Sequence, residues 1–198
     1  MLDLLVSNPI YFIILVAFLV ISIGVREFAH AYVAYKLGDS TPKYQGRVTL
    51  NPLAHVDPIG LVLLVIAGFG WGKPVEFDIY NLRNPKRDVL LISLAGPLSN
   101  LLIAFVGFVI GSNLGFNIFL NQFIYLNLVL FVFNLIPIHP LDGFKVVTGI
   151  LPYRLAYTWQ DLEKYGFYIL LILVITDAFK YIVSPAVAGI LSIFNLLI

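Results

Sequence analysis

The feature that most constrains this chain is a series of long apolar runs. A bilayer core about 30 Å thick needs roughly 20 apolar residues in a helix, and several runs approach or exceed that length. They cover residues 10–25, 89–112, 118–136 and 165–183, and a shorter one, 185–198, begins with a proline. The first run keeps a helix-compatible pattern through Ala34. We therefore predict an all-α polytopic membrane protein with about four to six membrane segments.

The composition supports a lipid environment. Hydrophobic residues make up 60% of the chain and charged residues only 12%, whereas soluble domains carry about 25% charge. The net charge of +1 gives no reason to expect a nucleic-acid partner. Because the chain has no cysteine, disulfides and thiolate metal ligands are excluded. We interpret residues 1–198 as one integral membrane domain, and the first run lacks the basic flank of a cleaved signal peptide.

The region after the first run contains shorter elements. Residues 44–52 and 73–79 alternate between apolar and polar side chains, which is typical of strands, so we expect them to pair in a small β-element at the cytoplasmic interface. Residues 59–72 between them are apolar but short and rich in glycine, which favours a re-entrant or buried segment over a full span.

The distribution of Lys and Arg predicts the orientation. If the first run ends in the cytoplasm and 59–72 re-enters, nearly all basic residues lie on that side, as the positive-inside rule requires. These residues are Lys36, Lys43, Arg47, Lys73, Arg83, Lys86, Arg87, Lys145, Arg154 and Lys164. The loop 113–117, which would be external, carries no charge. The N-terminus is then external.

Ionisable residues inside a span indicate function because they are costly there. The first run carries three of them near its cytoplasmic end, in the string Arg26-Glu27-Phe-Ala-His30. Positions 26 and 30 share one helical face. In an H-E-x-x-H motif this spacing lets two histidines bind one zinc ion, while the Glu acts as general base on the zinc-bound water. Here the Glu and the second His are present, and Arg26 stands at the first position.

A second polar group lies where the run 118–136 ends. Pro137 and Pro140 interrupt the helix, and a helix broken at membrane depth is tolerated mainly inside protein or beside a water-filled cavity. Asp142 and Gly143 follow this break. A carboxylate can serve as a zinc ligand, whereas the plain structural interpretation of Asp-Gly is a turn.

These motifs resemble those of the site-2 protease family of intramembrane zinc metalloproteases, in its compact bacterial branch. That family pairs H-E-x-x-H on one span with L-D-G at the broken end of a later span, which Glu27, His30 and Leu141-Asp142-Gly143 match. Three further stretches match in order, at Gly38-Asp39, at residues 46–60 and at residues 95–100. The resemblance covers roughly the first three quarters of the chain.

The resemblance implies a function and a set of site residues. It implies zinc held by His30 and Asp142, Glu27 as the base that activates water, and Asn100 and Asn134 lining the site. For Asn100, a hydrogen bond between helices is an equal alternative, because Gly96 four residues earlier favours close helix packing. The expected reaction is hydrolysis of a peptide bond within or near a transmembrane segment of another protein. The expected location is a bacterial cell membrane, with the active-site side toward the cytoplasm.

Arg26 raises an alternative to catalysis. A guanidinium offers no lone pair to a metal, so it cannot replace the first His as a ligand. His139 is an alternative ligand that would restore a zinc site, while His55 is more simply a hydrogen-bonded loop residue. Without zinc, we expect Arg26 to pair with Asp142. Two hypotheses follow, an intramembrane metallopeptidase and an inactive pseudoprotease that binds transmembrane partners. A transporter is disfavoured because the sequence has no evident internal repeat.

Overall fold

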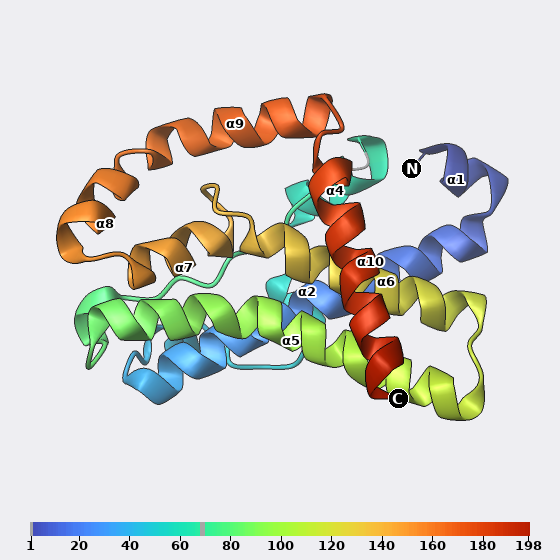
Figure 1. Ribbon diagram of the computed structural model, residues 1–198, viewed down its shortest axis with the longest axis horizontal. Coiled ribbons are helices and arrows are strands. Elements are labelled where there is room, and N and C mark those ends of the chain that lie inside the picture. The colour runs from blue at the N-terminus through green and yellow to red at the C-terminus, as the bar shows by residue number, and fades with distance from the viewer. Residues whose placement is uncertain (1, 68–69) are drawn as a thin grey trace.

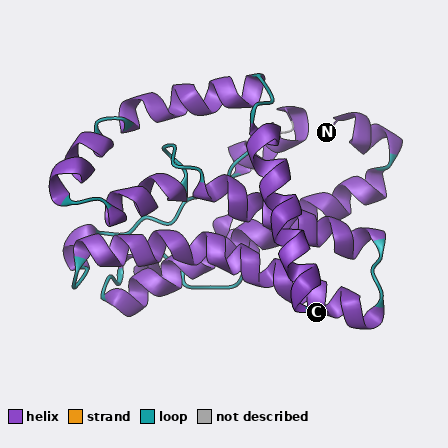
Figure 2. Cartoon of the chain, in the orientation of Figure 1, coloured by secondary structure: helices purple, strands orange, loops and turns teal. Residues whose placement is uncertain are grey.

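The computed structural model describes residues 2–67 and 70–198, and the regular elements in those ranges are helices joined by loops (Figures 1 and 2). The α-helices are α1 Leu2–Ser7, α2 Pro9–Leu37, α3 Thr41–Tyr44, α4 Pro58–Ala67, α5 Pro85–Leu114, α6 Ile118–Leu135, α7 Asp142–Ile150, α8 Tyr153–Gln160, α9 Glu163–Ile175 and α10 Phe179–Leu197. Two 3-10 helices, η1 Pro52–His55 and η2 Ile79–Asn81, lie in the loops. The predicted all-α fold is confirmed.

Within the described residues, four helices, α2, α5, α6 and α10, are long and apolar enough to cross a membrane. This number lies at the lower end of the predicted four to six. In Figure 1, α2, α5 and α6 run along one another, and α10 crosses α5 and α6. An apolar core forms where α5, α6 and α10 meet, around the buried Leu128 and Val187. Their outward faces carry exposed aliphatic side chains, as lipid contact requires.

Local sequence signals explain where the spanning helices begin. Pro9 and Pro85 occupy the first turns of α2 and α5, where a missing N–H costs nothing. The side chain of Asn8 accepts a hydrogen bond from the Tyr11 amide, and that of Asn117 accepts one from the Leu120 amide. These asparagines act as N-caps, so they fix the starts of α2 and α6.

The break between α6 and α7 positions the site. The chain leaves the helix at Ile136, passes Pro137 and Pro140, and becomes helical again at Asp142. A Cβ on Gly143 would lie 2.3 Å from the carbonyl oxygen of Leu135. Only glycine therefore allows the first turn of α7 to pack directly on the end of α6, which brings Asp142 back to the depth of the interior residues.

The predicted strand pair 44–52 and 73–79 does not form in the part of the chain that the structure describes. The first segment instead includes the end of α3, a turn at Gly46 with φ +68°, and the start of η1 at Pro52. A single antiparallel bridge, Val56 to Gly72, is present nearby. Pro52, which the alternating pattern places at the end of a strand, begins a 3-10 helix because its fixed φ suits a first helical turn.

The second segment, residues 73–78, is extended, but its hydrogen bonds go to other elements. The Lys73 amide donates to the His55 carbonyl at 2.8 Å, the Val75 amide to Glu27 Oε2 at 3.0 Å, and the Asp78 amide to Asp39 Oδ2 at 2.8 Å. The His55 carbonyl and the side chains of Glu27 and Asp39 therefore take the donors that a partner strand would have used.

The side chains of Asp39 and Arg47 form hydrogen bonds to the two ends of this extended segment, at Asp78 and Lys73. Asp39 is fully buried and accepts further hydrogen bonds from the Thr41 amide, the Thr41 hydroxyl and Asn81 Nδ2. Burial alone would raise the pKa of Asp39, but these hydrogen bonds hold the pKa below its usual value. Arg47 donates to the carbonyls of Ala54 and Lys73. The extended segment is thus fixed by side chains rather than by a ladder.

Two other predicted segments have different lengths from those expected. The run 165–183 is broken, because α9 ends at Ile175 and α10 begins at Phe179, with Asp177 between them at φ 53°. Polar Thr176 and Asp177 supply the turn, and α10 then continues through Pro185. The segment 59–72 contains α4, whose 10 residues are too few to span a bilayer. Residues 68–69 of that segment lie outside the described residues.

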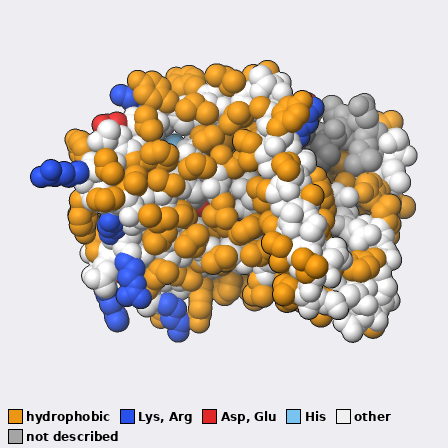
Figure 3. Space-filling view, viewed as in Figure 1, with side chains coloured by type: hydrophobic (Ala, Val, Ile, Leu, Met, Phe, Trp, Pro, Cys, Tyr) orange, Lys and Arg blue, Asp and Glu red, His pale blue; other side chains and the backbone are white. Residues whose placement is uncertain are grey.

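The basic side chains gather at one end of the molecule. Figure 3 shows Lys and Arg mainly at the end where α8 lies and α5 begins. Lys36 and Lys43 follow the same pattern, because they lie in the last turn of α2 and in α3.

Candidate functional site

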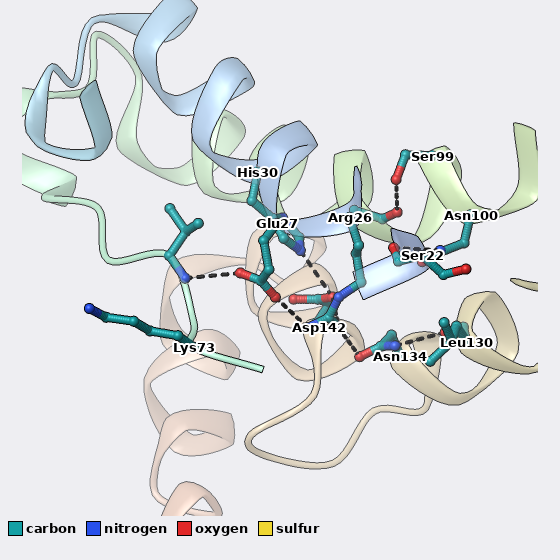
Figure 4. A network of polar contacts seen from close by, with 12 residues as sticks. Ser22, Arg26, Glu27, His30, Lys73, Ser99, Asn100, Leu130, Asn134 and Asp142 are labelled. Carbon is teal, nitrogen blue, oxygen red and sulfur yellow. Dashed lines mark hydrogen bonds and ion pairs between the residues drawn. The ribbon is translucent and has the colours of Figure 1, made fainter. Parts of the chain in front are cut away.

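The candidate site is built on the second half of α2. Arg26, Glu27 and His30 lie about three turns before the end of that helix, and they point toward the chain break between α6 and α7 (Figure 4). Glu27 and His30 are buried, with 2% and 6% of their surface exposed. Asp142, at the start of α7, approaches from the opposite side. The structure therefore brings together residues that are more than 100 positions apart in the sequence.

Arg26 lies at the centre of this group. Its Nη2 is 2.5 Å from Glu27 Oε1, and its Nη1 is 3.3 Å from Asp142 Oδ2. Nη1 also donates to the side-chain oxygen of Asn134 on α6. One guanidinium thus contacts two carboxylates and an amide from three different elements. The Arg26–Asp142 pair has the geometry expected from the sequence.

His30 is fixed at both ring nitrogens. Nδ1 lies 2.7 Å from the carbonyl oxygen of Ile92 on α5, and Nε2 lies 3.2 Å from Asp142 Oδ2. A carbonyl oxygen can only accept, so Nδ1 carries a hydrogen that it donates to Ile92. Nε2, the nitrogen left to bind a metal, instead faces the carboxylate.

Both oxygens of Glu27 are also occupied. Oε1 faces Arg26, and Oε2 accepts the Val75 amide from the extended segment. A general base needs an oxygen within hydrogen-bond reach of the water that it activates. In this arrangement Glu27 is a structural acceptor that ties α2 to residues 73–78.

Asp142 is held in its ionised form by its neighbours. Burial would raise the pKa of this carboxyl, but His30 and Arg26 hold the pKa below its usual value. Its position in the first turn of α7 adds a favourable interaction with the helix N-terminus. The charge of Lys145, also on α7, acts in the same direction. The carboxylate therefore has several cationic or dipolar partners without a metal.

Close helix packing under the site depends on Gly96 of α5. A Cβ at this position would lie 2.1 Å from His30 Nε2 and 2.9 Å from Arg26 Cγ. The site opens into a cavity of about 330 Å³ that Glu27, Val75, Phe133 and Asp142 help to line.

The other predicted residues lie in different places. Asn134 lines the cavity, as expected. Asn100 is fully buried and donates to the Ser22 carbonyl and to Asn127 Oδ1, so it links α2, α5 and α6 and does not line the cavity. His139 contacts Glu163 at 3.1 Å and lies outside the cavity. His55 is buried and bonds to the Thr49 carbonyl, in agreement with the loop interpretation.

These residues do not fit a catalytic zinc ion. Such a site normally has three protein ligands and an open position. Among the residues that the structure describes, no group of three His, Cys, Asp or Glu side chains is placed to hold a metal. His30 and Asp142 are two ligand-capable side chains, and the guanidinium of Arg26, which cannot coordinate, lies against both Asp142 and Glu27.

Sequence reasoning missed the backbone groups of the site. The Ile92 carbonyl and the Val75 amide hold His30 and Glu27, yet any residue type carries these groups, so no sequence signal marks them. Gly96 does carry a sequence signal, since a glycine in a span favours close helix packing, and the structure shows that close approach at His30.

Comparisons with known proteins agree with the motifs. The profile described as Peptidase family M50 matches residues 111–176. "Putative zinc metalloprotease YwhC" of Bacillus subtilis is 41% identical over 184 residues, which cover 86% of this chain and 84% of that protein. "Putative zinc metalloprotease Rip2" of Mycolicibacterium smegmatis is 30% identical over 84% of this chain and 68% of its own length.

A more distant relative is "Zinc metalloprotease MJ0392" of Methanocaldococcus jannaschii, 29% identical over 77% of this chain and 39% of that protein. No solved structure matches the chain. The same family follows from the ordered motifs on α2 and α7, from four helices long and apolar enough to span a membrane, and from 41% identity over 84% of a zinc metalloprotease relative. The chain belongs to peptidase family M50, the site-2 protease family of membrane-embedded zinc metalloproteases.

Proposed function

We propose that this chain is a non-hydrolytic member of its family, which binds segments of other membrane proteins without cleaving them. The observation that carries this proposal is the position of the Arg26 guanidinium, which bonds to Glu27, Asn134 and Asp142. A zinc ion would keep a neighbouring carboxylate ionised. Arg26 provides the positive charge in its place, without a Lewis acid and without a bound water to activate.

The state of Glu27 supports the same function. Removal of a proton from water requires a carboxylate oxygen that is free to accept it. Here Arg26 contacts one oxygen and the Val75 amide the other. Arg26 and Glu27 are thus held by their hydrogen bonds to each other and to the Val75 amide. In this proposal, the family's catalytic Glu has a structural role in the site.

A binding function needs a surface for the partner, and the extended segment 73–78 provides one. The amides of Lys73, Val75 and Asp78 are engaged, because they donate to the His55 carbonyl, to Glu27 and to Asp39. The Glu76 amide has no hydrogen-bond partner among the described residues. A carbonyl group of an extended peptide can accept a hydrogen bond from such a free amide.

The alternative function is zinc-dependent peptide-bond hydrolysis, which the names of the relatives favour. It requires a third ligand in place of Arg26. His139 is the candidate from the sequence, but its ring is engaged with Glu163 away from the cavity. The alternative therefore needs a rearrangement of the break between α6 and α7.

Zinc content and cleavage of a membrane-embedded reporter substrate separate the two functions. We expect the purified protein to hold no stoichiometric zinc and to cleave nothing. Arg26→His should bind about one zinc per chain, and its cleavage should stop on addition of a chelator. The double variant Arg26→His with Glu27→Gln is the matched control, because it should bind zinc without cleaving. One zinc per chain and chelator-sensitive cleavage in the unaltered protein would refute the proposal.

The orientation is part of the same proposal. We infer that the end bearing α8, the start of α5 and the end of α2 faces the cytoplasm of a bacterial cell. The gathering of Lys and Arg at that end supports this assignment (Figure 3). The partner would then be a transmembrane protein whose cytoplasmic flank reaches the extended segment.

A further inference from the structure

A large groove adjoins the candidate site on the basic side of the molecule. Its volume is about 780 Å³, and it runs between residues 74–79 (the extended segment and the start of η2), the first turns of α5, and helices α7 and α8. Val75, Phe77 and Lys145 line both this groove and the smaller cavity above Arg26. The two spaces therefore share a wall, and a chain lying along residues 74–79 would occupy the groove.

The floor of the groove is fixed by close helix packing. A Cβ on Gly149 of α7 would lie 2.6 Å from Leu90 Cβ and 3.3 Å from the Lys86 carbonyl of α5. Phe144, which is buried, stacks on Trp159 of α8 at 5.2 Å. The groove is thus a preformed feature between packed elements, and a partner need not open the helices to enter it.

The carboxylates and the lysines that line the groove differ in whether they have a polar side-chain partner. Both of its carboxylates have partners, because Glu163 contacts His139 at 3.1 Å and Glu76 accepts a hydrogen bond from Gln45 at 3.2 Å. In contrast, its two lysines, Lys86 and Lys145, form no ion pair with a carboxylate in residues 2–67 and 70–198. Lys145 also helps to lower the pKa of Asp142, but from beyond ion-pair distance.

The two lysines instead rest on aromatic rings. Lys145 Nζ lies 5.2 Å from the centre of the Phe77 ring, and Lys86 Nζ lies 4.9 Å from the centre of the Tyr153 ring. Contacts of this kind at exposed sites are weak, and the ammonium group keeps all its donors for another acceptor. Lys145 belongs to α7 and Lys86 to α5, so the two donors come from different helices that line the groove.

We propose that the groove selects membrane-protein partners whose extended flank, just beyond the transmembrane segment, carries carboxylate side chains. The inference rests on the proposed binding function and names the class of partner. A backbone carbonyl of the flank accepts a hydrogen bond from the free Glu76 amide, and its Asp or Glu side chains accept hydrogen bonds from Lys86 and Lys145. Side chains alternate along an extended chain, so residues two apart would face the same wall.

A binding assay with designed peptides tests the selection. The acidic probe is a synthetic peptide with an apolar helix of about 20 residues followed by a flank of alternating Val and Asp. The neutral probe has Asn in place of each Asp. Affinities are measured with the full-length protein in nanodiscs of a zwitterionic lipid, so that anionic headgroups do not compete.

We expect the acidic probe to bind about three- to tenfold more tightly than the neutral one, the range of one or two half-exposed ion pairs. Lys86→Gln and Lys145→Gln should each reduce this preference, and together they should abolish it. Lys43→Gln is the matched control, because that lysine lies outside the groove, over Tyr35. High salt should weaken binding of the acidic probe alone.

The outcomes separate this inference from the function on which it rests. Equal binding of the two probes, or a preference that the double lysine variant retains, overturns the acidic selection and leaves the binding function intact. Failure of both probes to bind, or cleavage of either, contradicts the proposed function itself. Loss of preference in Lys43→Gln would overturn the selection as well, because general surface charge, not the groove, would then attract the acidic flank.

Discussion

Replacement of Arg26 by a neutral side chain should destabilise the protein more than removal of the whole charge cluster. In Arg26→Met the new side chain keeps much of the volume, so the main loss is the positive charge. The side chains of Glu27 and Asp142 are only 3% and 16% exposed and would lose their shared cation. A buried carboxylate without a counter-charge is costly, because it has lost its hydration by water and no positive charge replaces it.

The expected magnitude follows from what the two carboxylates retain. Removal of one partner of a buried ion pair typically costs about 3–5 kcal/mol. Here Asp142 keeps its contact with His30 at 3.2 Å, and Glu27 keeps its hydrogen bond from the Val75 amide at 3.0 Å. We therefore expect a cost at the lower end of this range. A loss of about 3 kcal/mol corresponds to a fall in Tm of roughly 6–12 °C for a chain of this size. The triple variant Arg26→Met, Glu27→Gln, Asp142→Asn should lose less, about 1 kcal/mol, because no isolated charge remains.

Thermal unfolding in a mild detergent, followed by circular dichroism, measures both variants. Arg154→Ala is the control, since it removes an exposed arginine of α8 and should change stability by less than about 0.5 kcal/mol. The reasoning fails if Arg26→Met unfolds at the same temperature as that control. It also fails if the triple variant is less stable than the single one.

Three further perturbations test other parts of the structure. Gly96→Ala would place a Cβ 2.1 Å from an imidazole nitrogen of the site, so it should lower stability by about 1–3 kcal/mol, whereas Gly189→Ala, which meets nothing within 4 Å, should not; equal Tm values for the two variants would disprove the close approach. The folded-state pKa of Asp39 lies below the ordinary value of 3.8, so its stabilisation is complete above that pH and disappears as the pH falls through the folded-state pKa. Asp39→Asn should therefore be less stable than the unaltered protein at pH 7, with a difference that narrows below about pH 3.8; a difference that stays constant in unfolding scans from pH 7 to pH 3 would contradict this role. Because the chain has no native cysteine, single-cysteine variants at Asn84 and Phe116 report the orientation: a membrane-impermeant thiol reagent added to intact cells should label position 116 and leave 84 unlabelled, and the reverse pattern would invert the proposed topology.

The sequence predicted the site's members better than the surrounding loops. The spans are visible because apolar runs of this length seldom occur outside membrane-spanning helices. Glu27, His30 and Asp142 could be placed together because each is costly inside a membrane and the family motifs pair them. The ion pair of Arg26 followed from the chemistry of a guanidinium beside two carboxylates, and the separation in the structure is 3.3 Å.

The loops were predicted less well because their hydrogen bonds are decided by tertiary contacts. Alternation in residues 73–79 predicts a strand, but it cannot tell whether a partner strand or the side chains of Glu27 and Asp39 will take the amides, and Ile79 instead begins η2. The break at Asp177 was missed because the apolar residues on both sides favour one continuous helix. Such a break depends on two residues, and hydrophobicity averaged over a span conceals it.

The charge at Arg26 has a consequence for how the protein matures in the cell. A metal ion must be acquired after synthesis, and its occupancy varies with supply and with competing chelators. A guanidinium is part of the chain from translation onward and stays protonated at every physiological pH. A site held together by Arg26 is complete as soon as α2 meets α6 and α7. The site would therefore assemble even when zinc is scarce. A relative that relies on zinc would lack its central positive charge under that condition.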